Sequence, residues 1–414
     1  MKNKKSKVGL WSALTAITAI LTIAAIVGNI IANQYATTIN VALNASTYKI
    51  IHDSSNTEDT EYFKSDFASD AEREAYEAEL CAQVEAEGAA LLKNQNAALP
   101  LAQGAKVSLF GHGSVDLMYG GTGSGSVDTS KAPNFKQALE SQGINVNQTL
   151  WDLYSSDSMM SKYSRMTPAS ISDTLEANTQ YAVNEAPWSA LSSAESSFAE
   201  YGDAAIVVLS RSGGEGADLS YGEVNYLALD ENEKAMLQNV AEMKKNGTVK
   251  KTILLINSAN ALQVDFLKNN EYDIDAALWI GDVGISGINA VAEILTGKVN
   301  PSGSLVDTYC YDNFSAPAMW NFTPTTYEGY VEGGDVSAKA KSYMIYQEGI
   351  YVGYKYYETR YEDFVTGNGN AGDYAYGDVV AYPFGYGMSY TNFDISDMNV
   401  SYNAADDTYT VTVK

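Results

Sequence analysis

Short, wholly apolar runs alternate with longer amphipathic segments through the middle of the chain. The runs are typical of strands buried on both faces of a parallel sheet, and they lie at Val107–Phe110, Ala204–Leu209, Thr252–Ile256 and Ala276–Ile280. The amphipathic segments predict helices at Asp70–Ala90, Asp230–Lys245, Ala259–Lys268 and Gly287–Leu295, with a short helix beginning at Phe135. This alternation predicts βαβ units, and therefore an α/β fold with a mostly parallel sheet and helices on both faces.

The two ends of this alternating region have different patterns. In the first predicted helix, Leu80, Val84 and Leu91–Leu92 are expected to share one face. After about residue 308 the alternation stops, and Tyr, Gly and Asp become frequent. Residues 398–402 and 408–413 then alternate in polarity on either side of a polar turn, which predicts a β-hairpin.

The N-terminal segment combines lysines with a long apolar run. Lys2, Lys4, Lys5 and Lys7 precede an uncharged stretch over residues 8–32, which is about long enough to cross a lipid bilayer as a helix. The lysines predict a cytoplasmic N-terminus, with the globular part extracellular and the protein in the cell membrane as a single-pass chain. A cleaved signal peptide is the alternative.

The net charge and the small number of cysteines and histidines argue against several classes of function. The formal net charge of −25 argues against nucleic-acid binding, which requires a basic surface. Two cysteines, Cys81 and Cys310, and two histidines, His52 and His112, offer no ligand spacing typical of a zinc site, so we expect no metal and no cofactor.

A glycine-rich loop follows the strand Ala204–Leu209 and contains one carboxylate. The segment Arg211-Ser212-Gly213-Gly214-Glu215-Gly216-Ala217-Asp218 cannot continue the strand, because its glycines favour a sharp turn. Loops at the carboxyl ends of parallel strands are where ligands bind in open α/β sheets. Glu215 is therefore a candidate proton donor or acceptor, and the alternative is an exposed Glu in a flexible turn.

Several motifs together resemble glycoside hydrolase family 3, which includes many β-glucosidases. They are residues 87–94 with Leu99-Pro100-Leu101, the loop 110–127, the loop 210–218, Gly297 with 299–303, residues 346–358, and 382–390. The resemblance covers roughly residues 40–414. It implies an acid/base role for Glu215, a sugar-facing loop containing Gly121, Thr122 and Ser124, and substrate-binding roles for Arg211 and Asp218. Asp218 would alternatively hold the loop by hydrogen bonds to backbone N–H groups. Arg211 would orient a carboxylate by bidentate bonding or be structural.

The sequence pattern and the resemblance together divide the chain, and the resemblance implies the family's inverted order, with the α/β sandwich first, the fibronectin-like domain next and the barrel last. Residues 1–32 would form the cytoplasmic tip and transmembrane anchor, 33–68 an extended lead-in, 69–310 the α/β sandwich domain, 311–392 its Tyr- and Gly-rich closing segment, and 393–414 the beginning of a fibronectin-III-like domain. The family's TIM-type barrel and its nucleophilic Asp are not found, so a barrel is expected downstream or in trans.

Two functions follow as hypotheses. The first is a membrane-anchored retaining exo-β-glycosidase that hydrolyses β-glucosides or oligosaccharides, with this chain supplying the acid/base domain. The second is a non-catalytic carbohydrate-binding or structural module. Nucleotide binding by the loop Gly120–Ser126 is the weaker interpretation, because the loop lacks the Gly-Lys-Ser/Thr of a P-loop.

Overall fold

The computed structural model describes residues 2–43, 45, 65–166, 181–214, 225–321, 325–326, 342–369, 372 and 374–414. It divides the chain into two compact units, Met1–Asp66 and Phe67–Lys414, which are described separately. The first unit contains the helices α1 (Lys2–Gln34) and α2 (Ala36–Ala42).

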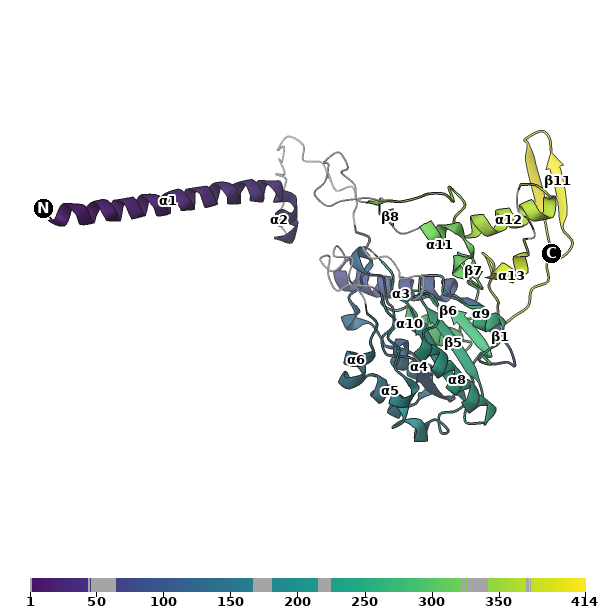
Figure 1. Cartoon of the computed structure of the whole chain (residues 1–414). Coiled ribbons are helices and arrows are strands. Elements are labelled where there is room, and N and C mark those ends of the chain that lie inside the picture. Colours follow the sequence, from purple (N-terminus) through teal and green to yellow (C-terminus); the bar gives the residue numbers. More distant parts are fainter. Residues whose placement is uncertain are drawn as a thin grey trace. The chain divides into compact units, whose positions relative to one another are not determined.

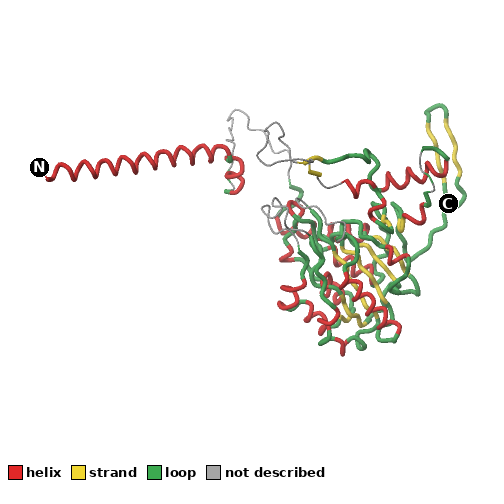
Figure 2. The backbone as a smooth tube through the Cα atoms, viewed as in Figure 1, coloured by secondary structure: helices red, strands yellow, loops and turns green. Residues whose placement is uncertain are grey.

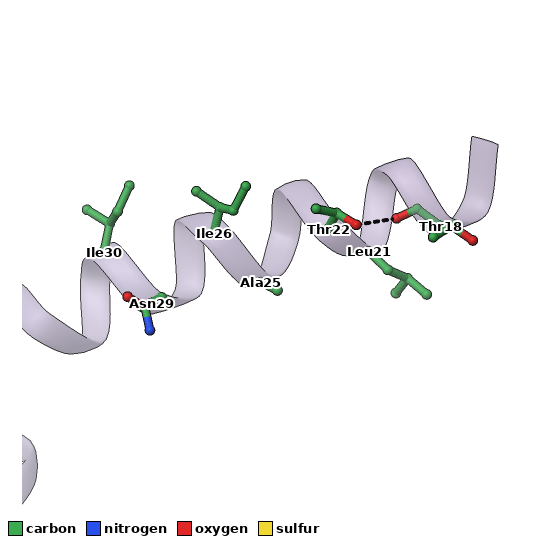
Figure 3. Close-up of a pocket in the computed structure, with 7 residues that line it drawn as sticks. All are labelled: Thr18, Leu21, Thr22, Ala25, Ile26, Asn29 and Ile30. Carbon is green, nitrogen blue, oxygen red and sulfur yellow. Dashed lines mark hydrogen bonds between the residues drawn. The ribbon is translucent and has the colours of Figure 1, made fainter. Parts of the chain in front are cut away.

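Helix α1 exposes its apolar side chains along its length. Within the described part of the chain, its span Lys7–Gln34 is the one helix long and apolar enough to cross a membrane. The Thr15, Thr18 and Thr22 hydroxyls each donate to the carbonyl four residues earlier, at 2.9 Å. Figure 3 shows the Thr22–Thr18 bond on an open groove along the helix. These bonds satisfy the three hydroxyl groups within the helix itself.

A six-stranded sheet lies at the centre of the second unit (Figures 1 and 2). Its strands are β1 (Ala90–Asn94), β2 (Lys106–Phe110), β3 (Asn145–Val146), β4 (Ala204–Ser210), β5 (Thr252–Asn257) and β6 (Ala276–Trp279). The spatial order is β1-β6-β5-β4-β2-β3, in which every pairing is parallel except that of the edge strand β1 with β6. The mostly parallel sheet expected from the sequence is therefore confirmed.

Helices cover both faces of this sheet. Their bounds are α3 (Asp70–Gly88), α4 (Phe135–Ser141), α5 (Gln148–Tyr154), α6 (Asp157–Tyr163), α8 (Glu231–Lys245), α9 (Asp265–Lys268) and α10 (Gly287–Leu295). Alternate residues of β4 enter different cores: Ile206 and Val208 pack with α4 and α10, whereas Val207 and Leu209 pack with α5 and α8. A strand buried on both faces has no polar positions, which is why β4 is a continuous apolar run.

Short elements follow the sheet. They are β7 (Tyr309–Cys310), α11 (Pro317–Asn321), β8 (Thr325–Thr326), β9 (Ser342–Tyr343), α12 (Tyr354–Thr366), α13 (Tyr376–Val379), β10 (Val380–Tyr382), β11 (Asn399–Asn403) and β12 (Thr408–Thr412). Strands β11 and β12 form the predicted hairpin, in which Val400 pairs with Val411 and Tyr402 with Tyr409. These four side chains are exposed, so one face of the hairpin is apolar and open.

Two sequence predictions are wrong in detail. The segment 259–264 is not helical, and only Asp265–Lys268 forms a helix; Gln263 instead donates its backbone N–H to the Leu227 carbonyl at 2.8 Å. In α3, Leu80 and Val84 are exposed, whereas Leu91 and Leu92 belong to strand β1. Helix α3 packs on α10 through Cys81 and Glu85, because glycines on the facing segment allow close approach.

Glu85 is a buried carboxyl group in this helix contact. One oxygen, Oε1, has no hydrogen-bond partner, and a Cβ on Gly287 would lie 2.8 Å from the Glu85 Cβ. Burial, together with smaller contributions from Cys81 and Asp282, raises the pKa of Glu85 to about 8. The carboxyl group therefore holds a proton in the folded chain over a pH range in which the unfolded chain has lost it.

The stability of the chain should depend on pH through Glu85. Its folded pKa lies above the ordinary 4.5, so its contribution to the unfolding free energy is complete below about pH 4.5 and falls as pH rises toward 8. Glu85→Gln, which keeps the neutral form, should flatten this fall, as measured by urea unfolding at several pH values. Glu79→Gln, at an exposed position of the same helix, is the matched control. Equal slopes for both variants would contradict the prediction.

Candidate active site

Two glycine-rich loops meet at the carboxyl ends of β2 and β4. After β2 the chain forms β3, which pairs with one edge of β2, and then β4, which pairs with the opposite edge of β2. The strand order therefore reverses between β2 and β4. Such a reversal opens a crevice in which doubly wound sheets bind ligands. The β2 loop is defined here as residues 111–126, and the β4 loop as residues 211–225.

The β2 loop lies directly against the start of the β4 loop. The Thr122 backbone N–H donates to the Gly213 carbonyl at 3.1 Å, and Thr122 forms a parallel bridge with Gly214. A Cβ on Gly214 would lie 2.2 Å from Thr122 Oγ1, and one on Gly121 would lie 3.1 Å from the Gly213 oxygen. Glycine at these positions is therefore what allows the two backbones to touch. Ser124 lies farther along the β2 loop and is exposed.

The carboxylates predicted for this site lie outside the described residues. Glu215 and Asp218 both belong to the undescribed segment 215–224, and the structure describes the β4 loop up to Gly214 and again from Asn225. The structure describes the base of that loop, which consists of the residues that follow β4 and of those that precede α8.

Arg211 joins the two ends of the β4 loop. Its Nε donates to the Tyr226 carbonyl at 2.6 Å, and its Nη2 donates to the Ala228 carbonyl at 2.8 Å. Nη1 donates to the Ser210 carbonyl at 3.0 Å, and Nη1 and Nη2 each donate to one Glu233 oxygen at 2.7 Å. These bonds use all five guanidinium donors. The expectation that Arg211 contacts substrate is therefore not supported, and its contacts fit the structural alternative.

Glu233 is the buried counter-ion of Arg211. The two side chains are 1% and 0% exposed, respectively. Glu233 also accepts from the Asp230 backbone N–H at 2.9 Å, while Asp230 accepts from the Glu233 N–H at 2.7 Å, which completes a capping box at the start of α8. Burial lowers the pKa of Arg211, but the Glu233 carboxylate more than offsets this, so the net change is upward. The ion pair thus fixes the loop base to the N-terminus of α8.

Two tyrosines line the contact between the loops and were not singled out from the sequence. Thr122 Oγ1 lies 2.9 Å from the Tyr181 hydroxyl, and the Ser212 N–H donates to the Tyr226 hydroxyl at 2.7 Å. The two rings are 5.8 Å apart. Burial raises the pKa of Tyr226, so this hydroxyl stays protonated at neutral pH. In a chain so rich in tyrosine, the sequence carries no signal that distinguishes these two.

His112 is enclosed at the start of the β2 loop. Glu185 Oε2 accepts from the His112 backbone N–H at 2.9 Å and lies 2.8 Å from Nδ1. Both side chains are buried, and Glu185 Oε1 accepts from the Ala186 N–H. Neither ring nitrogen of His112 has a hydrogen-bond partner among the described residues, so the side chain is packed beside the Glu185 carboxylate. Among the described residues, no group of three or more His, Cys, Asp or Glu side chains is arranged to hold a metal ion.

Comparison with known proteins places this architecture in a family. The family model described as the glycosyl hydrolase family 3 C-terminal domain matches residues 89–354. A β-glucosidase of Ruminococcus albus is 31% identical over 319 residues, which cover 77% of this chain and 28% of that protein. Beta-glucosidase A of Butyrivibrio fibrisolvens is 33% identical over 342 residues, which cover 77% and 35%. The chain spans about a third of the length of these relatives, 28% and 35%.

Solved structures agree with the sequence comparison. The β-glucosidase 3B of Thermotoga neapolitana in complex with α-D-glucose is similar, with a TM-score of 0.59 and 28% identity over 80% of this chain and 40% of that one. A β-glucosidase of Paenibacillus barengoltzii gives a TM-score of 0.59 and 27% identity over 81% and 32%. The sheet order, the paired loops and the match over residues 89–354 lead to one conclusion: this chain belongs to glycosyl hydrolase family 3, through that family's C-terminal domain.

Proposed function

We propose that this chain supplies the acid/base domain of a retaining exo-β-glycosidase that hydrolyses β-glucosides or related oligosaccharides. The observation that carries the proposal is the contact of Thr122 with Gly213–Gly214 at the carboxyl ends of β2 and β4, one residue before Glu215. The relatives of highest similarity reported above are named β-glucosidases, which supports the reaction class.

Glu215 is proposed as the general acid and base. In retaining hydrolysis one carboxyl group attacks the anomeric carbon, and a second, roughly 5–5.5 Å away, protonates the leaving oxygen and later activates water. A Glu on a loop whose base is held by buried groups can be presented to a partner surface, which desolvates it and raises its pKa toward the range that a general acid needs. Asp218 is proposed to hold the same loop, and Gly121, Thr122 and Ser124 to face the sugar.

The nucleophile is proposed to come from a TIM-type barrel domain, either downstream or in trans. The open apolar face of the β11–β12 hairpin, which carries Val400, Tyr402, Tyr409 and Val411, supports the proposal that residues 393–414 begin a fibronectin-III-like sandwich. In such a sandwich a second sheet covers this face.

A turnover assay tests the proposed activity. The full-length protein is assayed with nitrophenyl β-glucoside, β-xyloside and α-arabinoside, alone and with a separately produced family 3 barrel domain. We expect turnover of at least one glycoside whenever both domains are present. If no glycoside is turned over in either setting, while the chain still binds oligosaccharide, the non-catalytic carbohydrate-binding module would be the correct function.

We further propose that α1 anchors the protein in the cell membrane with the globular part outside. The span Lys7–Gln34 has 28 residues and at about 1.5 Å per residue is long enough for a bilayer core of roughly 30 Å. The protein should sediment with membranes and resist extraction by alkaline carbonate, but not by detergent. A mature N-terminus located after residue 32 would show instead that the segment is a cleaved signal peptide.

A further inference from the structure

Arg165 lies beneath both loops of the candidate active site. It follows α6 and immediately precedes Met166, which exchanges two backbone hydrogen bonds with Ala182, at 3.0 and 3.2 Å. Those bonds place Arg165 beside the segment that carries Tyr181, the partner of Thr122. The side chain is only 6% exposed.

The Arg165 guanidinium links the β2 loop to the end of β4. Nη1 donates to the Ser210 hydroxyl at 2.6 Å and also to the Asp116 carbonyl. Nη2 lies 3.1 Å from the Asp116 carboxylate. Asp116 precedes Thr122 on the β2 loop, and Ser210 is the last residue of β4, immediately before the β4 loop. One buried cation therefore contacts the β2 loop at Asp116 and the last residue of β4, from which the β4 loop leaves the sheet.

The charges around Arg165 are balanced differently from those around Arg211. Burial, with a contribution from Arg211, lowers the pKa of Arg165, and Asp116, Tyr226 and Asp282 offset this only in part, whereas the net change for Arg211 is upward. Asp116 is its one carboxylate contact within ion-pair distance among the described residues, and Nε is buried without a hydrogen-bond partner there. Arg211, by contrast, has every donor occupied. Arg165 is thus held by its contacts to the two loops and not by a complete hydrogen-bond shell of its own.

We propose that Arg165 is a positioning residue, which fixes the β2 loop relative to the end of β4 and so orients the base of the β4 loop, along which the proposed acid/base residue Glu215 follows in sequence. This inference rests on the proposed function. Arg165 acts through Ser210 and Asp116 and does not itself contact the substrate. Lysine cannot replace it, because a single ammonium group cannot contact the Ser210 hydroxyl and the Asp116 carboxylate in the same planar arrangement.

The dependence of the rate on the leaving group distinguishes a misplaced general acid from a general loss of structure. In the full-length protein assayed with its barrel domain, Arg165→Lys should lower kcat/KM on a phenyl β-glycoside by about 10- to 100-fold, because protonation of a poor leaving group requires a well-placed acid. The loss on a dinitrophenyl β-glycoside, which needs little protonation, should be clearly smaller. Arg73→Met, a surface position on α3, is the control.

Amide hydrogen exchange provides a readout that does not depend on activity. In Arg165→Lys, exchange should rise in residues 116–126 and 211–214 and stay unchanged in β5 and β6. An equal loss on both glycosides, exchange that rises throughout the sheet, or no change in either readout would overturn the proposal. If Arg165→Lys does not fold, the charge-matched double variant Arg165→Met/Asp116→Asn is measured instead, and wild-type leaving-group dependence in that variant would also overturn the proposal.

The test separates this inference from the proposed function. A wild-type protein with no activity on any glycoside would contradict the proposed function, and the exchange data alone would then decide the role of Arg165. An active wild type whose Arg165→Lys variant behaves like Arg73→Met would contradict the positioning role and leave the proposed function standing.

Discussion

Glu215→Ala is expected to lower kcat/KM on phenyl β-glucoside by about 10²- to 10⁴-fold in the protein assayed with a family 3 barrel domain. The reason is that the leaving phenolate would depart without a proton donor. A dinitrophenyl glucoside leaves without that help, so its glycosylation step should be slowed far less. The measurement is a series of aryl glucosides compared between wild type and variant.

Added azide should restore turnover of the activated substrate by Glu215→Ala. Without a general base, water attacks the glycosyl-enzyme slowly, whereas azide is a nucleophile that needs no deprotonation. The product should be the β-glycosyl azide, because two inversions retain the configuration. Glu223→Ala is the matched control, since it removes a carboxylate from the same loop. Full activity of Glu215→Ala on all substrates, together with a loss in Glu223→Ala, would show that the acid/base was assigned to the wrong residue.

Arg211→Met is expected to destabilise the fold by about 3–5 kcal/mol, because it leaves the buried Glu233 carboxylate without its counter-ion. The Arg211 and Glu233 side chains are 0% and 1% exposed, so water cannot replace the lost bonds. The Tyr226 and Ala228 carbonyls also lose their donors. Urea unfolding of the chain, followed by circular dichroism, measures the change.

A double variant separates the destabilising effect of an unpaired buried charge from the effect of lost side-chain packing. Arg211→Met/Glu233→Leu removes both charges and should recover much of the lost stability, as apolar replacements of buried ion pairs often do. Activity should not recover with it, because the two ends of the β4 loop are no longer joined. Arg73→Met, at an exposed ion pair of α3, should have little effect on stability. If Arg211→Met were no more destabilising than Arg73→Met, the ion pair would not be what holds the loop base.

The strands and the amphipathic helices could be predicted because their patterns are local. The β4 run has no polar position, since both faces are buried, and α8 buries Met236, Leu237, Val240 and Met243 at helical spacing. The prediction for 259–264 was wrong because the backbone of that segment bonds to distant residues instead: Gln263 donates to Leu227, and Ala261 accepts from Asn313. No periodicity encodes such tertiary contacts.

The prediction of which face of α3 is buried was wrong for a related reason. Leucine and valine at helical spacing indicated a buried stripe, but the structure buries Glu85 and exposes Leu80 and Val84. The close contact with α10 depends on Gly284 and Gly287, which allow Cys81 and Glu85 to approach. A sequence window over α3 alone cannot contain that information, because the glycines lie about two hundred positions further along the chain. Cys81, for example, contacts the Val283 carbonyl, which is 202 residues later in the sequence.

The sequence by itself determined the alternating α/β pattern, the apolar N-terminal helix and the glycine-rich loop with Glu215, since each depends on residues near one another in the chain. The tertiary structure alone decided that Thr122 touches Gly213–Gly214, that Glu233 and three carbonyls occupy every donor of Arg211, and that Arg165 joins the β2 loop to the end of β4. The physical reason is strand order. Only the reversal between β2 and β4 brings these sequence-distant loops to the same edge of the sheet.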